Sequence, residues 1–153
     1  MRCFDYYENT GEPISHYVQV IRDKERELKF QHGVAVLPHD ARQRMLETGK
    51  NRQQTIESLG LKAEITPDHR VDDGIEAVRR MLPNCWFDDT RAEYGIDCLR
   101  MYRSEFDEKN NVLKPRPVHD WTSHGADAFR AGAMYQPRNH QWEPLKYDNR
   151  GII

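Results

Sequence analysis

The sequence predicts an α/β fold in which a mixed sheet is flanked by helices. Short apolar segments of strand length alternate along the chain with longer segments whose apolar residues recur every three or four positions, as on one face of a helix. The length of 153 residues is enough for one domain with its own core. A hydrophobic content of 37% excludes a disordered chain.

The chain opens with a predicted strand followed by a predicted helix. Residues 2–8 are rich in aromatic side chains that partly alternate with polar ones, and a turn signal at 9–11 ends them. Pro13 then begins a helix over 13–29, because proline is favoured in the first helical turn and the apolar residues that follow share one face. We expect this amphipathic helix to pack on a sheet.

Two further strands follow, with a short helix between them. The apolar run 33–37, which Pro38 ends, is typical of a strand buried on both faces in an α/β sheet. A helix over 53–59 is stopped by Gly60, and residues 61–65 alternate apolar and polar side chains as a third strand. We therefore expect these two strands and the opening strand to be neighbours in one sheet.

Two more helices are predicted after the third strand. Asp72 can cap a helix that Pro83 ends, and either Asp88 or Asp89 can cap the next one. The apolar residues of this second helix recur at helical spacing as far as Phe106. We expect both helices to cover the sheet.

The last part of the sequence predicts a loop, a helix and a tail. Residues 107–117 are polar and contain prolines, which indicates a loop, and a final helix is predicted over 120–134. Beyond Pro137 the chain is polar. The predicted organisation is one domain over 1–136 and a polar C-terminal tail over 137–153.

Composition limits the functions that the chain can have. The net charge of −2 argues against a protein that coats nucleic acid by bulk electrostatics, so any DNA contact must be local. Cys3, Cys85 and Cys98 lie far apart without a CxxC pair, which predicts reduced thiols. The sequence has neither an apolar run of membrane-spanning length nor a signal-peptide pattern. We therefore expect a cytoplasmic protein without membrane partners.

The densest group of chemically active side chains lies on the last predicted helix. It consists of His119, Asp120, His124, Asp127 and Arg130. Residues three or four apart share a helix face, so His124 shares one with both aspartates. One interpretation is a polar helix that Asp120 caps. The other follows from the small residues around Asp127, which would let the helix approach a sheet and bring this carboxylate to the strand ends.

A second group follows the apolar strand at 33–37. His39 and Asp40 come directly after Pro38, at the carboxyl end of that strand, where ligands of open α/β sheets gather. Asp40 can equally be a helix cap or turn residue. Two acids that meet at one sheet edge would suit Mg²⁺ or Mn²⁺, which prefer oxygen ligands. Phosphodiester hydrolysis by two ions normally uses three or more carboxylates, and only two are well placed here.

Two weaker patterns are rejected. The string 48–50 is similar to part of a phosphate-binding loop, but Asn51 stands where that loop needs Ser or Thr. His69 has no second histidine at metal-binding spacing and is interpreted as a loop residue. Neither pattern predicts an ATPase or a zinc enzyme.

Several strings together resemble the C-terminal nuclease domain of phage terminase large subunits. Each string alone is a weak signal, but their order and spacing are fairly specific. The resemblance covers nearly the whole predicted domain. The strings are 5–9, 37–42, 48–50, 85–88 and 119–130.

The resemblance implies an RNase H-like fold that cuts concatemeric double-stranded DNA with two Mg²⁺ or Mn²⁺ ions. The family's middle acid maps onto Asp40 and its helical acid onto Asp127, which are thus the implied catalytic and metal-binding residues. The family's first acid lies on a strand that normally precedes the strand beginning here near Arg2. The implied fold therefore lacks its first strands and one catalytic acid. The family does not use the strand that carries Asp5 and Glu8 catalytically, so neither is expected to replace that acid.

The resemblance also implies neighbours and partners for the two acids. Arg130 is expected either to bind phosphate or to pair with an acid. The implied partners are double-stranded DNA and, in the parent family, the ATPase motor domain, the small terminase subunit and the portal, in the cytoplasm of a host cell. The residues implied to surround the metal ligands are His39, His119, Asp120, His124 and Arg130.

Two other functions stay open at this point. The chain can be a catalytically inactive prophage remnant or an accessory module that binds DNA or a packaging partner, and the missing acid favours this alternative. It can also be an unrelated α/β enzyme with a site built from Asp and His. That interpretation requires both main strings to match the family by accident.

Overall fold

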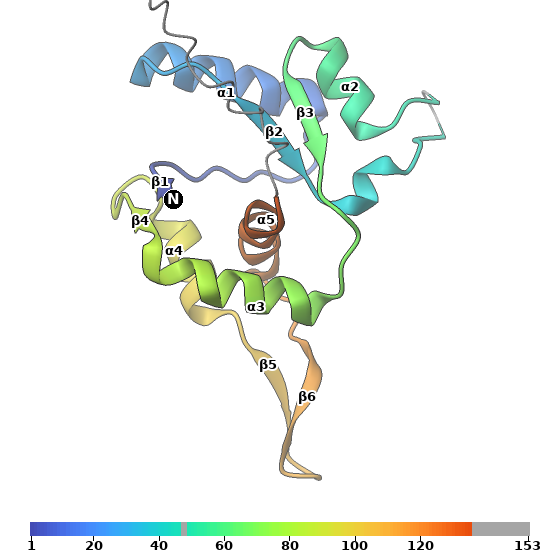
Figure 1. The fold of residues 1–153 in the computed structure, drawn as a ribbon, viewed down its shortest axis with the longest axis vertical. Helices are drawn as coiled ribbons and strands as arrows, with labels where there is room; N and C mark the ends of the chain where they lie inside the picture. The colour runs from blue at the N-terminus through green and yellow to red at the C-terminus, as the bar shows by residue number, and fades with distance from the viewer. Residues whose placement is uncertain (47–48, 136–153) are drawn as a thin grey trace, which may run out of the picture.

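A computed structural model describes residues 1–46 and 49–135, which form a mixed α/β structure as predicted (Figure 1). The predicted tail over 137–153 and Thr48 lie outside the described residues. The helices are α1 (Ile14–Leu28), α2 (Arg52–Ser58), α3 (Val71–Met81), α4 (Glu93–Met101) and α5 (Ser123–Met134), with 3-10 turns η1 (His39–Arg42) and η2 (Leu82–Asn84). The strands are β1 (Arg2–Cys3), β2 (Val34–Leu37), β3 (Lys62–Ile65), β4 (Trp86–Phe87), β5 (Ser104–Asp107) and β6 (Val112–Pro117).

The described strands form separate two-stranded ladders. Strands β2 and β3 are parallel, with Val34 opposite Lys62. Strands β1 and β4 are also parallel, with Arg2 opposite Trp86, and β5 and β6 form an antiparallel hairpin. The prediction that the opening strand neighbours the other two in one sheet was therefore wrong. The opening segment instead continues along the loop after β4. There the backbone N–H of Tyr6 donates to the backbone carbonyl of Arg91.

The predicted helix over 13–29 is confirmed as α1. It begins directly after Pro13. The residue that follows its last turn is Lys29, whose φ of 54° lies in the left-handed region and ends the helix. The helix over 53–59 is confirmed as α2, where Asn51 and Gln54 form a capping box. Helices α1 and α2 lie with the β2–β3 pair in one half of the molecule (Figure 1).

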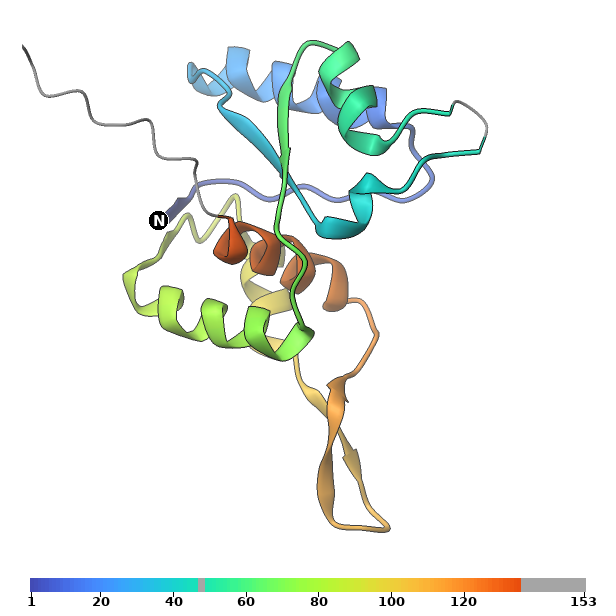
Figure 2. The same cartoon turned by 45° about the vertical axis from the view of Figure 1, so that its right-hand side comes forward.

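The other half contains α3, α4 and α5, and α5 also touches β2 (Figure 2). Glycines allow these helices to lie close together. A Cβ atom at Gly125 of α5 would lie 2.7 Å from the Cβ of Cys98 in α4. A Cβ atom at Gly74 of α3 would lie 2.5 Å from the Cδ of Arg130 in α5. The small residues of α5 thus serve helix packing, in addition to the predicted approach to a strand.

The predicted loop over 107–117 is instead the outer part of a hairpin that projects from the helical half (Figure 2). Its turn forms because the Asp107 carboxylate accepts backbone N–H groups of Lys109 and Asn110, and Asn111 adopts a left-handed φ of 53°. The preceding helix ends at Met101 rather than reaching the hairpin. The prolines that indicated a loop are compatible with an edge strand, because an edge strand can spare a backbone donor.

The described core is made mainly of small side chains. Strand β2 is only partly buried, so the prediction of burial on both faces was wrong. Trp86 of β4 is 76% exposed and lies at a sheet edge rather than in the core. No helix in the described part of the chain is long and apolar enough to cross a bilayer. The buried apolar residues are Val18, Ala41, Leu61, Ala63, Ala92, Cys98, Ala126 and Ala131.

The predicted caps differ in detail from the observed ones. Helix α3 begins one residue before Asp72, which lies in its first turn. Asp88 accepts the backbone N–H of Arg91 at 2.9 Å and of Thr90 at 3.1 Å, so it organises the turn before α4 rather than capping the helix itself. These aspartates still act on the N-terminal side of a helix, as their type predicts.

Candidate functional site

One cavity of about 520 Å³ lies between the end of β2 and helix α5, and it is lined by both predicted acids. Asp40 reaches it from η1, which Pro38 begins directly after β2. Asp127 reaches it from the second turn of α5. We call this space the acid cavity. Its other polar lining residues are His39, His69, His124 and Arg130.

Asp40 is exposed and weakly paired. Its side chain is 52% exposed, and its Oδ2 lies 3.6 Å from Nη1 of Arg52, the first residue of α2. An ion pair this open to water contributes little to stability. The Asp40 carboxylate is therefore available to a ligand that enters the acid cavity.

Asp127 has a closer partner. Its Oδ1 lies 2.9 Å from Nη1 of Arg130, three residues later on α5. Arg130 is only 17% exposed, and the same nitrogen lies 3.5 Å from the Tyr102 hydroxyl. Burial and the negative charge of Asp127 raise the pKa of Tyr102. Of the two predicted roles for Arg130, the structure shows pairing with an acid.

Histidines also line the acid cavity. His39 Nε2 lies 3.7 Å from Oδ1 of Asp68, and its ring packs edge-on against His69 with 5.6 Å between centroids. The sequence prediction missed His69 because it considered only metal-binding spacing. A better signal was available, because His69 follows β3 closely, just as Asp40 follows the parallel neighbour β2.

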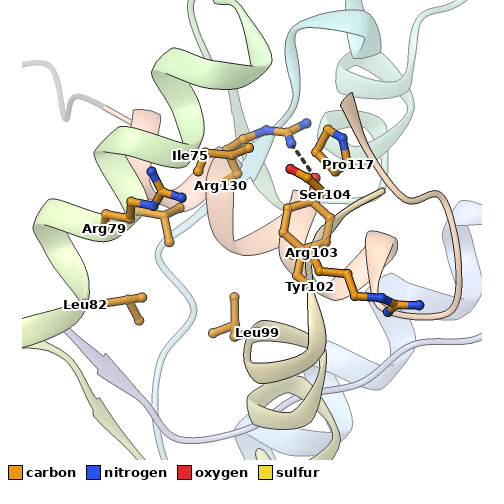
Figure 3. A pocket seen from close by; sticks show the side chains of 11 residues that line it. Ile75, Arg79, Leu82, Leu99, Tyr102, Arg103, Ser104, Pro117 and Arg130 are labelled. Carbon is orange, nitrogen blue, oxygen red and sulfur yellow. Dashed lines mark hydrogen bonds between the residues drawn. The ribbon is translucent and has the colours of Figure 1, made fainter. Parts of the chain in front are cut away.

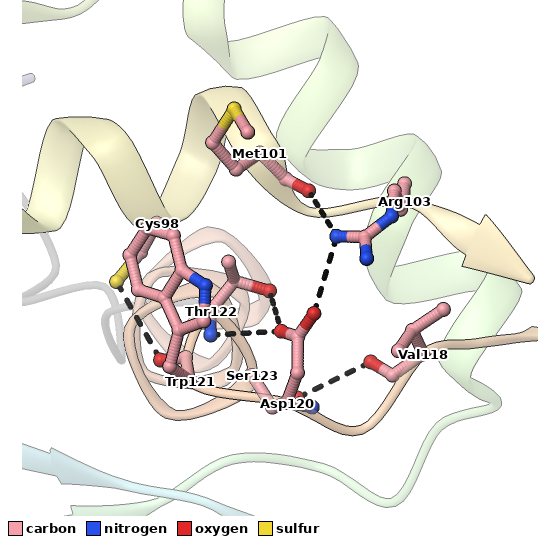
Figure 4. A network of polar contacts seen from close by, with 8 residues as sticks. All are labelled: Cys98, Met101, Arg103, Val118, Asp120, Trp121, Thr122 and Ser123. Atoms are coloured by element: carbon pink, nitrogen blue, oxygen red, sulfur yellow. Dashed lines mark hydrogen bonds and ion pairs between the residues drawn. The ribbon is translucent and has the colours of Figure 1, made fainter.

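Asp120 lies outside the acid cavity and holds the start of α5 (Figure 4). Its carboxylate accepts the Thr122 hydroxyl at 2.6 Å, the Thr122 backbone N–H at 2.9 Å and the guanidinium of Arg103 at 3.1 Å. The two bonds from Thr122 and the charge of Arg103 lower the pKa of Asp120. Asp120 therefore organises the turn before α5, whose N-cap is Thr122, so the interpretation of Asp120 as the helix cap was wrong. His119 also lies outside the acid cavity, and its ring lies edge-on to His124 at 6.0 Å.

Asp5 and Glu8 do not line the acid cavity. Asp5 pairs with Lys24 of α1. Glu8 accepts the Tyr6 hydroxyl at 2.5 Å, and burial together with this bond raises the pKa of Tyr6. Neither residue supplies a further carboxylate to Asp40 and Asp127.

The donor set can be compared with the two-ion centre that the resemblance implies. Two Mg²⁺ ions about 4 Å apart need many oxygen ligands, normally from three or more carboxylates. Within the described residues, no group of at least three His, Cys, Asp or Glu side chains is arranged to hold a metal ion. Asp40 and Asp127 each face an arginine instead. The described residues therefore do not fit a complete two-ion centre.

Comparisons with models of protein families, with curated protein sequences and with solved structures find no match. The resemblance to phage terminases therefore rests on the short sequence strings alone. The geometry of the acid cavity is a separate observation, which brings Asp40 and Asp127 to one place from distant parts of the chain.

Proposed function

We propose that the chain is the nuclease-domain part of a phage DNA-packaging terminase large subunit, with an RNase H-like parent fold. One observation supports this most strongly. The two residues that resemble the family's acids, Asp40 and Asp127, line the same cavity beside the carboxyl end of β2. The substrate would be double-stranded DNA. The partners would be the ATPase motor domain, the small terminase subunit and the portal, in the cytoplasm of the host cell.

The roles of the two acids follow from their chemistry. Asp40 and Asp127 would contribute oxygen ligands to Mg²⁺ or Mn²⁺, which supplies water activation and charge neutralisation when bound. Arg130 pairs with Asp127 at 2.9 Å, so a cation would compete with this arginine for the carboxylate. The acid cavity is lined by two carboxylates, and two-ion cleavage normally uses three or more, so we propose no cleavage step by this chain alone.

A second function is favoured by the arginine partners of both acids. An acid that pairs with arginine keeps its charge balanced without a metal ion, as Asp40 and Asp127 do here. This arrangement supports a catalytically inactive prophage remnant or an accessory module that binds DNA or a packaging partner.

Cation binding tests whether Asp40 and Asp127 form one site. We expect the 153-residue chain to bind Mn²⁺ weakly, and Asp40→Asn or Asp127→Asn to weaken this binding by about tenfold or more. Titration with Mn²⁺ followed by electron paramagnetic resonance measures it. Asp73→Asn is the matched control, because Asp73 is exposed on α3 and lies away from the acid cavity. Equal Mn²⁺ affinity in all variants would contradict the site.

Cleavage assays separate the two functions. We expect little or no nicking of supercoiled plasmid by the purified chain with Mg²⁺ or Mn²⁺, because two carboxylates leave at least one ion of a pair poorly held. Robust nicking that is lost in Asp40→Asn or Asp127→Asn would show that the chain is an active nuclease and would refute the inactive alternative. Nicking that survives both substitutions would refute the assignment of the acids.

A further inference from the structure

Two more cavities lie next to the acid cavity, beyond Arg130. One has a volume of about 260 Å³ and lies between α3, α4 and α5. We call it the apolar cavity, and Figure 3 shows the side chains that line it, with Leu82 from η2, Leu99 from α4, and Ile75 and Arg79 from α3. Its apolar lining residues are Ile75, Val78, Leu82, Leu99, Pro117 and Ala126.

The other cavity, of about 550 Å³, is rich in arginine, and we call it the arginine cavity. Arg116 of β6 has no acid within 4.0 Å in the described part of the chain, and Arg70 approaches Asp72 only at 4.0 Å. Such an accumulation of guanidinium groups is notable in a chain whose net charge is −2. Its charged lining residues are Arg70, Arg116, Arg130, Asp72 and Asp127, together with His119.

The three cavities are neighbours that share lining residues. Asp127 and Arg130 line both the acid cavity and the arginine cavity. Tyr102, Pro117 and Arg130 line both the arginine cavity and the apolar cavity. The arginine cavity thus adjoins both the two acids and the apolar space.

The order of these surfaces matches the chemistry of a nucleic-acid strand. Arginine is the side chain that best fits phosphate oxygens, because its planar group donates two parallel hydrogen bonds. A base has a flat apolar face that gains from burial against apolar and guanidinium groups. In a duplex the bases are stacked and paired, so only an unpaired base can enter a side cavity.

We propose that the arginine cavity and the apolar cavity bind an unpaired nucleotide next to the acid cavity. The phosphate lies against Arg70 and Arg116, and the base enters the apolar cavity beside Tyr102, which lines both cavities. The proposal rests on the proposed DNA-cleaving parent function, and it specifies the form of the DNA, with a single-stranded nucleotide beside the acids.

Binding to labelled DNA without divalent cations tests this proposal. Fluorescence anisotropy with EDTA compares a blunt duplex, the same duplex with a short single-stranded end, and that end with abasic sugars. We expect the single-stranded end to improve the affinity of the full chain by about tenfold, and the abasic end to lose most of this gain. Equal affinities for the three DNAs would overturn the proposal.

Variants of the lining residues test which cavity binds the base and which binds the phosphate. Ser104→Trp places a large ring at the apolar cavity and should remove the preference for the single-stranded end, whereas Ser15→Trp, on exposed α1, should retain it. Arg116→Gln should weaken binding of every DNA by several-fold, with recovery in Arg116→Lys. Arg80→Gln makes the same charge change on exposed α3 outside the cavities and should have little effect.

The outcomes separate this proposal from the proposed function. A preference for the single-stranded end that Ser104→Trp leaves intact, or an Arg80→Gln loss equal to that of Arg116→Gln, would overturn the cavity assignment. If the cavity assignment is overturned while Mn²⁺ binding still depends on Asp40 and Asp127, the nuclease assignment survives. If the preference is found and Mn²⁺ binding is absent, the nucleotide site stands and the metal site fails.

Discussion

The turn before α5 and the middle of α5 carry similar side chains but differ in what these side chains do. Asp120 in the turn is satisfied by Thr122 and Arg103, and its bonds fix the chain just before the helix. Asp127 in the middle of the helix has one close partner, Arg130, and lines a cavity. The comparison teaches that an aspartate saturated by several donors is structural. An aspartate with a single cationic partner beside a cavity is the better candidate for ligand binding.

Close packing of the first turn of α5 against α4 should be the most sensitive feature. We expect Gly125→Ala to lower the free energy of unfolding by about 1–3 kcal/mol, because the added Cβ would lie 2.7 Å from the Cβ of Cys98. Urea denaturation followed by circular dichroism measures the change. Gly33→Ala is the control, since its added Cβ meets no atom within 4 Å. A loss no greater than in that control would mean that α5 and α4 are not packed this closely.

Exchanging each aspartate for asparagine should give different effects in the turn before α5 and in the middle of α5. Asp127→Asn should reduce Mn²⁺ binding with little change in the unfolding midpoint, because asparagine can still accept a bond from Arg130. Asp120→Asn should lower the thermal midpoint by a few degrees and leave Mn²⁺ binding intact, because it weakens the bonds to Thr122 and Arg103. Thermal melts and Mn²⁺ titrations on both variants measure this. Equal changes in thermal midpoint and in Mn²⁺ binding for the two variants would show that Asp120 and Asp127 do not differ in role.

Acid titration should show a smaller effect, which is specific to Asp120. The pKa of Asp120 is lowered from the ordinary 3.8 in the folded chain. Its stabilising effect is therefore complete above pH 3.8 and is lost as the pH falls through the lower folded value. Stability of the wild type should thus fall more steeply with acid than that of Asp120→Asn. Parallel curves from unfolding at several pH values would show that Asp120 titrates normally.

Local periodicity in the sequence predicted the helices well, since the helix after Pro13 and the one ended by Gly60 depend on nearby residues. Strand pairing was predicted poorly. The two-residue strand β1 pairs with β4 through contacts between distant segments, which no local pattern encodes. The prolines of the segment 107–117 predict a loop, whereas Pro117 ends strand β6 of a hairpin.

The sequence patterns that pointed to Asp40 and Asp127 concern residues that line one cavity in the structure. The rule that ligands gather at strand ends pointed to Asp40 after β2, and the small residues of α5 indicated that Asp127 approaches another element. The same rule points to His69, which follows β3 and lines the same cavity. The sequence could not divide Asp120 from Asp127, because the donors that saturate Asp120 include Arg103, which another element supplies.

Arg130 lines both the acid cavity and the arginine cavity, so under the two proposals it would couple their ligands. Its guanidinium is held by Asp127, so a cation that binds Asp127 competes with Arg130 for that carboxylate. The released guanidinium is then free for an anion in the arginine cavity, which it also lines. Cation and phosphate would thus bind with positive cooperativity, and thermodynamic reciprocity requires each to strengthen the other by the same factor.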